Sequence, residues 1–171
     1  MRIQNILVAL FAVAFFCGAG AAPARADLKI DVTRGQVNPM PIAIPDFSGG
    51  ADVDATLGHD LVDVISADLN RSGLFRTLDQ KSFIQNALAA GANPNFSEWR
   101  TINAQALVTG TLSKTGNGRT RVEFRLWDVT AEQQLVGMAY MTTPTNWRRI
   151  GHIIADAIYK RITGDRDRVI V

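Results

Sequence analysis

Two periodicities organise the hydrophobic positions of this chain. Apolar and polar residues alternate in four segments, a pattern that predicts half-buried strands at 28–33, 106–115, 119–129 and 135–142. Apolar residues recur at intervals of three and four in two longer segments, which predicts amphipathic helices at 54–70 and 146–163. Short apolar runs at 41–47 and 74–78 predict two more strands, and single helical turns are expected after Asp79 and Ser97.

The predicted helices have recognisable ends. Asp54 is expected to cap the first helix and Asn146 the second, because both side chains can accept a bond from a free backbone N–H. Gly164 is expected to stop the second helix. The apolar stripe that the second helix is expected to bury comprises Trp147, Ile150, Ile154 and Ile158.

The order of elements defines the fold class. Two strands, a helix, a strand, a short helix, three strands and a final helix follow one another. This order predicts an α/β fold of the α+β type, in which helices pack on a mixed, largely antiparallel sheet. Ser48-Gly49-Gly50 and Gly116-Asn117-Gly118 are expected to be turns, the latter a hairpin.

The first 26 residues have the pattern of a secretory signal peptide. Arg2 supplies the positive end, Ile6–Phe16 is an apolar core too short to span a bilayer, and Ala24 and Ala26 mark a cleavage site before Asp27. The alternative is an uncleaved N-terminal anchor. The sequence predicts export and a mature chain that starts at Asp27.

Composition and charge narrow the function. The 171 residues are 47% apolar and 20% charged, enough for one globular domain. The net charge of +2 comes from two arginines in the leader, so the mature chain is neutral and lacks the main driver of nucleic-acid binding. Cys17 is the only cysteine, and Phe16 before it does not fit a lipid-attachment site. No disulfide, thiolate metal site or cofactor is expected.

Candidate catalytic chemistry is sparse. The sequence contains no phosphate-binding loop, zinc-protease motif or nucleophile elbow. His59 with Asp63, or His152 with Asp156, could act as a base with an orienting carboxylate in a small secreted hydrolytic or ligand-binding domain. The more ordinary interpretation is a solvated helix face with helical-spacing pairs, which is common in proteins.

The strand predicted at 28–33 starts directly at the mature terminus and is followed by a glycine–proline break. Such a strand can join its own sheet, detach, or add to the sheet edge of a partner. The residue pattern alone leaves these alternatives open.

Several ordered segments resemble the N-terminal domain of the TolB family. They are Pro41–Phe47, Ile65–Phe75, Ala106–Gly110, Leu126–Asp128, Gly151–Asp156 and Ile162–Gly164. The resemblance implies a mixed-sheet fold similar to anticodon-binding domains. It also implies a non-enzymatic periplasmic adaptor of the Tol-Pal system in a Gram-negative bacterium. The family links the inner-membrane protein TolA to the outer-membrane lipoprotein Pal, supports outer-membrane integrity and constriction at cell division, and is used in colicin import.

The resemblance also implies a partner site and a domain plan. TolA binding maps onto the mature N-terminal residues Asp27, Leu28, Lys29, Ile30, Asp31, Val32, Thr33 and Arg34. No catalytic, cofactor or metal residue and no small-molecule substrate is implied. Residues 27–164 correspond to the N-terminal domain, and 165–171 to a linker and the start of the six-bladed propeller that carries the Pal-binding face in the family. This sequence does not continue into the propeller, so Pal binding is not expected of it.

Overall fold

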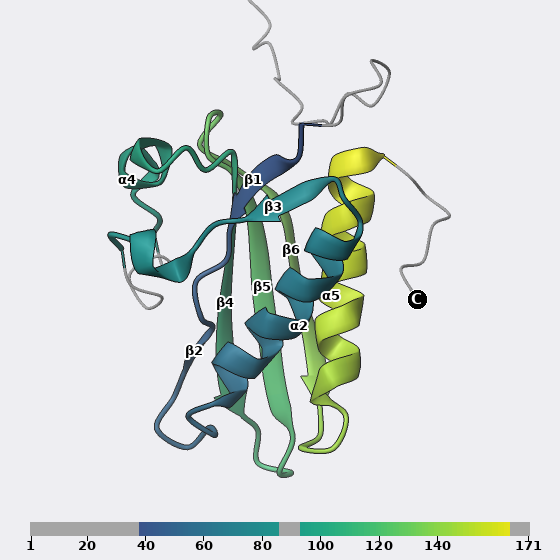
Figure 1. Cartoon of the computed structure of the whole chain (residues 1–171). Coiled ribbons are helices and arrows are strands. Elements are labelled where there is room, and N and C mark those ends of the chain that lie inside the picture. The colour runs from purple at the N-terminus through teal and green to yellow at the C-terminus, as the bar shows by residue number, and fades with distance from the viewer. Residues whose placement is uncertain (1–37, 86–92, 165–171) are drawn as a thin grey trace, which may run out of the picture.

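The computed structural model describes residues 38–85 and 93–164, and the structural statements below concern that part of the chain. Two long helices lie side by side along one face of a twisted sheet (Figure 1). The strands are β1 (Met40–Ala43), β2 (Ser48–Gly49), β3 (Phe75–Thr77), β4 (Ala106–Lys114), β5 (Thr120–Asp128) and β6 (Gln133–Thr142). The helices are α2 (Leu57–Arg71), η1 (Gln80–Ser82), α4 (Phe96–Thr101) and α5 (Trp147–Thr163).

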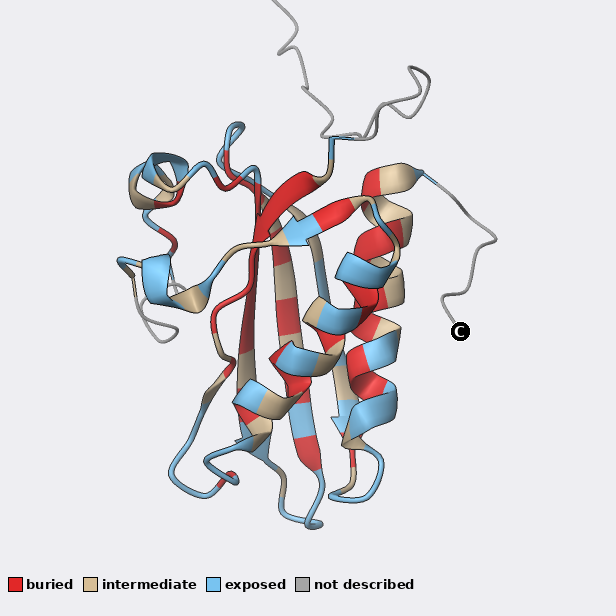
Figure 2. Ribbon diagram, in the orientation of Figure 1, coloured by how far each residue is buried: buried red, intermediate tan, exposed pale blue. Residues whose placement is uncertain are grey.

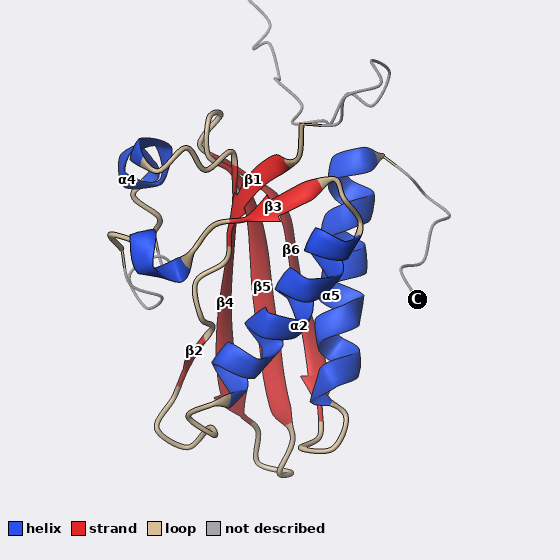
Figure 3. Cartoon of the chain, viewed as in Figure 1, coloured by secondary structure: helices blue, strands red, loops and turns tan. Residues whose placement is uncertain are grey.

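The sheet is mixed, as the sequence predicts. Its strand order is β3-β1-β4-β5-β6, with β2 also pairing with β4. β1 runs parallel to β3 and β4, whereas β4, β5 and β6 form two long antiparallel ladders. These three long strands contrast with the short β1, β2 and β3 (Figure 3). The prediction of a turn at 48–50 is wrong in part, because Ser48 and Gly49 pair in parallel with Thr111 and Leu112 of β4.

The main core lies between the sheet and the two long helices (Figure 2). Alternate residues of each strand point toward the helices, since side chains along a strand alternate between the two faces of a sheet. The largest fully buried members of this core are Phe124, Ile42, Leu61, Ile65, Leu69, Leu126, Ile154, Ile158 and Ile162.

A second, smaller core covers one end of the opposite face. Trp99 of α4 is 1% exposed and is packed with Ala43, Leu107 and Val129. The ring of Phe83 meets Trp99 edge-on at 5.1 Å between centroids. The indole N–H of Trp99 donates to Gln85 at 3.0 Å, so burying this residue leaves no polar atom unpaired.

The two long helices begin within a few residues of their predicted starts, but no side chain caps them. α2 begins at Leu57 with Thr56 at the N-cap position, and the prediction that Asp54 caps it is wrong. The carboxylate of Asp54 accepts the N–H of Thr56 at 3.0 Å, which forms a turn immediately before the helix. Asn146 occupies the N-cap position of α5 without a capping side-chain bond.

The C-terminal stop of α5 is confirmed. Gly164 adopts a φ of 70°, and its N–H donates to the carbonyl of Lys160 at 3.0 Å. The prediction that Trp147 belongs to the buried stripe is wrong in part. Trp147 is the first residue of α5 and only half-buried, with the guanidinium of Arg148 4.4 Å from its ring centroid. The remaining stripe residues, Ile150, Ile154 and Ile158, are buried as predicted.

Of the small helical elements, η1 begins where the sequence predicts and α4 begins two residues earlier than expected. Asp79 caps η1 by accepting the N–H of Lys81 at 2.9 Å, as the sequence predicts. Ser97 lies inside α4 rather than capping it, because the helix begins at Phe96 after Asn95. The hairpin at 116–118 joins β4 to β5 as predicted.

Candidate functional site

The predicted partner-binding segment and the predicted cleavage site fall outside the described residues. Asp27–Arg34, with Ala24 and Ala26, precede residue 38, and the predicted linker at 165–171 also lies beyond the described part. Their roles stay predictions. What the structure does describe is the element that the segment leads into, which is β1.

β1 occupies a protected position in the sheet. All four of its residues are buried, and it lies between β3 and β4. The N–H of Met40 donates to the carbonyl of Leu74 at 2.9 Å, and the carbonyl of Pro41 accepts the N–H of Gln105 at 3.0 Å. Only a short stretch of chain therefore separates residues 27–34 from a strand that is firmly held in the sheet.

The first histidine pair is present and belongs to a larger cluster. The Nε2 of His59 lies 3.6 Å from a carboxylate oxygen of Asp63, four residues along α2. Its Nδ1 lies 3.0 Å from Asp46, in the loop after β1. Asp46 also accepts a bond of 2.9 Å from the side-chain amide of Gln80. Sequence reasoning missed Asp46 and Gln80, which lie on other elements.

The electrostatics of His59 follow from this geometry. The hydrogen bond to Asp46, together with the charges of Asp46 and Asp63, raises the pKa of His59 above 6.5, because these groups favour the protonated ring. The His59 side chain is 55% exposed. An exposed, carboxylate-stabilised imidazolium suits a surface ion pair that ties α2 to the loop before it.

The second histidine meets a carboxylate that the sequence did not point to. His152 of α5 places its Nδ1 2.5 Å from a carboxylate oxygen of Asp68 in α2. The other oxygen of Asp68 accepts from the guanidinium of Arg71 at 3.0 Å. The Asp68 side chain is only 4% exposed. A buried carboxylate of α2 therefore holds His152 and links the two long helices.

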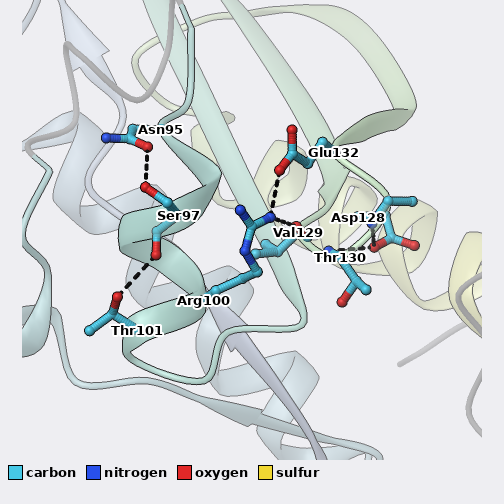
Figure 4. A network of polar contacts seen from close by, with 9 residues as sticks. Asn95, Ser97, Arg100, Thr101, Asp128, Val129, Thr130 and Glu132 are labelled. Carbon is cyan, nitrogen blue, oxygen red and sulfur yellow. Dashed lines mark hydrogen bonds and ion pairs between the residues drawn. The ribbon is translucent and has the colours of Figure 1, made fainter.

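A third polar network fixes α4 to the rest of the molecule (Figure 4). Arg100 donates to the carbonyl of Val129 at 3.1 Å and to the carboxylate of Glu132 at 2.6 Å, in the connection from β5 to β6. The buried Asp128 accepts the N–H groups of Thr130 and Ala131 at 2.8 Å each. These bonds pair the backbone N–H groups of the turn after β5, and they stabilise that turn.

A groove runs between the last strand of the sheet and α5. Its volume is about 520 Å³, and it is lined by Val136, Met138, Tyr140, Ile153, Asp156, Ala157, Lys160 and Arg161. Met138 is 46% exposed, which is unusual for a large apolar side chain on the core side of a sheet. The elements and motifs predicted from the sequence do not point to this surface. The run of uncharged residues along β6 was the available signal.

Two further features of the described residues concern metal ions and membranes. Within 38–85 and 93–164, no group of three or more histidine, cysteine or carboxylate side chains is placed to hold a metal ion. In the same part of the chain, no helix has the length and apolar character needed to cross a bilayer.

The fold and these sites define an α/β domain with two helices on one face of a mixed sheet. Residues 28–135 match the family described as the TolB amino-terminal domain. The chain is 52% identical over 165 residues to the Tol-Pal system protein TolB of Paramagnetospirillum magneticum. The chain therefore belongs to the TolB family.

The match covers nearly all of this chain but only part of the relative. The match spans 96% of this chain but 36% of the Paramagnetospirillum protein, so the chain corresponds to about a third of that relative's length. A crystal structure of TolB from Acinetobacter baumannii is similar with a TM-score of 0.61 and 26% identity, over 80% of this chain and 31% of that one. This similarity supports the fold class.

A more distant structure shares the fold alone. The lipoprotein GNA1162 from Neisseria meningitidis matches with a TM-score of 0.51 and 14% identity, over 71% of this chain and 96% of that one. At this level of identity, function does not follow from the shared architecture.

Proposed function

We propose that this chain is a periplasmic, non-enzymatic adaptor module of the Tol-Pal system. It binds the inner-membrane protein TolA through its mature N-terminal residues 27–34, after the leader is removed at Ala26. Through this contact it supports outer-membrane integrity, constriction at cell division and the import of colicins and other proteins.

Membership of the TolB family is the observation that carries the proposal. The 52% identical relative is named as a Tol-Pal system protein. The alternation of Leu28, Ile30 and Val32 with polar residues gives the segment one apolar face, as a strand added to a partner's sheet requires. The buried β1 that follows offers a rigid base for such a segment.

An adaptor needs no catalytic residues, and the contacts of both histidines are of a structural kind. The two histidines of the described residues are held by carboxylates, Asp46 and Asp63 for His59 and Asp68 for His152. Each arrangement joins separate structural elements. A role in stability accounts for both clusters, so the adaptor function needs neither of them.

Calorimetric titration with the C-terminal domain of TolA tests the proposal. The chain 27–171 is expected to bind, and a chain that starts at Val37 is expected not to bind. Two point variants refine the test. Ile30→Glu places a charge on the apolar face of the segment and is expected to abolish binding, whereas Lys29→Glu changes the opposite face and serves as the matched control.

Equal affinity of the long and short chains would overturn the assigned segment. Loss of binding in both point variants would show that charge, and not an apolar strand face, governs the contact. Circular dichroism of every variant confirms that the folded part is retained.

A further inference from the structure

We propose that the pocket between the first turns of α2 and α5 and the end of the sheet binds a small zwitterion, of the chemical class of a free α-amino acid. The ammonium group of the ligand meets the carboxylates of Asp54 and Asp60, and its carboxylate meets the ammonium group of Lys114. This site goes beyond the proposed adaptor function and is independent of residues 27–34.

The pocket lies at the end of the molecule where β4 ends, β5 begins and both long helices start (Figure 1). Leu57 and Trp147, the first residues of α2 and α5, both line it. Its volume is about 170 Å³. Liquid water occupies about 30 Å³ per molecule, so the space corresponds to roughly six waters. The pocket therefore admits a small molecule and not a helix or strand of a partner.

One wall of the pocket is a polar row across the sheet. Lys114 is opposite Thr120, and Thr120 is opposite Thr142, in the two antiparallel ladders. Side chains of opposite residues share a face, and Val122 and Phe124, which follow Thr120 on that face, are buried in the core under the helices. The row therefore marks the position at which the apolar core ends and polar side chains take its place.

Charged side chains of both signs face this pocket without pairing with one another. Asp54 and Asp60 line it at the start of α2, and Lys114 lines it from the sheet. One oxygen of Asp54 accepts the N–H and the hydroxyl of Thr56 at 3.0 Å each, and that hydroxyl lies 3.4 Å from one oxygen of Asp60. Within the described part of the chain, none of the three charges forms an ion pair. The second oxygen of each carboxylate and the ammonium group of Lys114 are thus available to a ligand.

The charges lie close enough to influence one another. The hydrogen bonds from Thr56 lower the pKa of Asp54, and the charge of Lys114 lowers it further. Asp54 is therefore ionised at neutral pH, and Lys114 lies near it without contact. A ligand that bridges the two provides the charged contacts that these side chains do not make with each other.

Thr120 adds an unused hydrogen-bonding group. It is 3% exposed and lines the pocket, and its hydroxyl has no hydrogen-bond partner among the described residues. No side-chain oxygen or nitrogen in that part of the chain is both enclosed and unpartnered, so the Thr120 oxygen opens onto the pocket. Buried hydroxyl groups normally have a partner. A polar ligand in the pocket supplies one.

A zwitterion satisfies this set of charges better than a simple ion does. A cation is attracted by the two carboxylates and repelled by Lys114, whereas an anion is attracted by Lys114 and repelled by both carboxylates. A molecule with both groups forms charge-assisted hydrogen bonds at each end, which are the strong ones. The start of α5 favours the anionic end, because its first turn has neither an acidic residue nor a capping side-chain bond.

The apolar part of the lining limits the side chain of the ligand. Leu57, Pro144 and Trp147 contribute to this part. The indole ring of Trp147 is held from one side by the guanidinium of Arg148, 4.4 Å from the ring centroid. With a pocket volume of about 170 Å³, the space beyond the two charged groups suits a small aliphatic side chain, such as that of alanine or valine.

Titration of the purified full chain with L-valine, followed by the NMR shifts of the backbone amides, is the first test. Saturable shifts at Thr56, Thr120 and Trp147 are expected. Isobutylamine is valine without the carboxylate, and isovalerate is valine without the ammonium group. Each analogue is expected to bind about tenfold more weakly than valine, since one charge-assisted contact is lost.

A charge variant tests which group recognises the carboxylate. Lys114→Met keeps the length of the side chain and removes its charge. It is expected to weaken valine binding about tenfold and to leave isobutylamine binding unchanged or stronger, because the amine loses only a repulsion. Lys81→Met makes the same change at an exposed lysine of η1 and is the matched control.

A second variant separates ligand binding from stability. Thr120→Val keeps the shape of the side chain and removes its hydroxyl. The urea midpoint is expected to stay the same or rise, since the hydroxyl has no described partner to lose. Valine binding is expected to weaken. Lower stability with unchanged binding would show that this hydroxyl serves the fold and not the pocket.

Three further results would overturn the proposal. No saturable shift up to the solubility limits of valine and alanine would show that the pocket does not take an amino acid. Equal affinity for valine and isobutylamine, or unchanged valine binding by the Lys114→Met variant, would show that the carboxylate is not recognised there. Binding of glucose in place of valine would show that the pocket recognises neutral hydroxyl groups and not a pair of charges.

Discussion

His59 illustrates how a surface side chain can connect elements through charge. Its ring lies between Asp46, from the loop after β1, and Asp63, from its own helix. Both carboxylates favour the protonated ring, and the hydrogen bond to Asp46 is the largest contribution to its raised pKa. Asp46 is also held by Gln80, so the cluster joins three parts of the chain.

The first prediction concerns the pKa of His59. A histidine whose pKa is higher in the folded state than its unfolded value of 6.5 stabilises the fold below that pH. This contribution disappears as the pH rises through the folded-state pKa. Asp46→Asn is expected to lower the pKa of His59, measured by NMR titration, and Asp63→Asn is expected to lower it less.

The same variant gives a thermodynamic check. The free energy of unfolding that Asp46→Asn removes is expected to be larger at pH 5.5 than at pH 8.5, as measured by urea denaturation. An equal loss at both values would contradict the ion pair, because only the charged form of His59 depends on Asp46 in this way.

Gly58 carries a second prediction at the residue scale. A Cβ at this position would lie 2.1 Å from the backbone carbonyl oxygen of Phe47. Alanine normally stabilises a helix by about 1 kcal/mol over glycine. Here the overlap with backbone dominates, and Gly58→Ala is expected to cost about 1–3 kcal/mol or more. Gly116→Ala, which meets no atom within 4 Å, is expected to change the free energy of unfolding by less than about 0.5 kcal/mol.

Asp68 joins two elements, because its side chain on α2 contacts His152 on α5. Its carboxylate is buried and bound by Arg71 and His152. Removing this acceptor deletes two hydrogen bonds to a charged group, while the donors of Arg71 and His152, which are more than half exposed, bind water instead. Asp68→Ala is expected to lower the free energy of unfolding by about 2 kcal/mol, measured from the urea midpoint at constant slope. Asp63→Ala, exposed on the same helix, is the control and is expected to change it by less than about 0.5 kcal/mol.

The elements themselves could be predicted where a periodicity is long. α2, α5 and the antiparallel strands β4 to β6 follow patterns of nine or more residues, and their bounds agree with the sequence within a few positions. β2 could not be predicted, since two residues carry no period. It exists because Ser48 and Gly49 run alongside the part of β4 that β1 does not reach.

The side-chain clusters were less predictable than the elements. Asp46 and His59 are 13 residues apart, and Asp68 and His152 are 84 apart. Their pairing depends on how the elements pack, which local patterns do not encode. A pair at helical spacing, such as His59 with Asp63, could be found from the sequence because the helix alone brings it together. The groove beside β6 depends on strand order and was missed for the same reason.

At the scale of the whole molecule, folding and partner binding are expected to be separable. Among the described residues, both hydrophobic cores are built from side chains between Met40 and Ile162. Removing residues 27–36 from the mature chain, so that it starts at Val37, is therefore expected to leave the circular dichroism spectrum nearly unchanged and the free energy of unfolding within about 0.5 kcal/mol. The same truncation is expected to abolish TolA binding. A large loss of stability would contradict this separation, because the segment would then be part of the fold and its deletion would disturb binding indirectly.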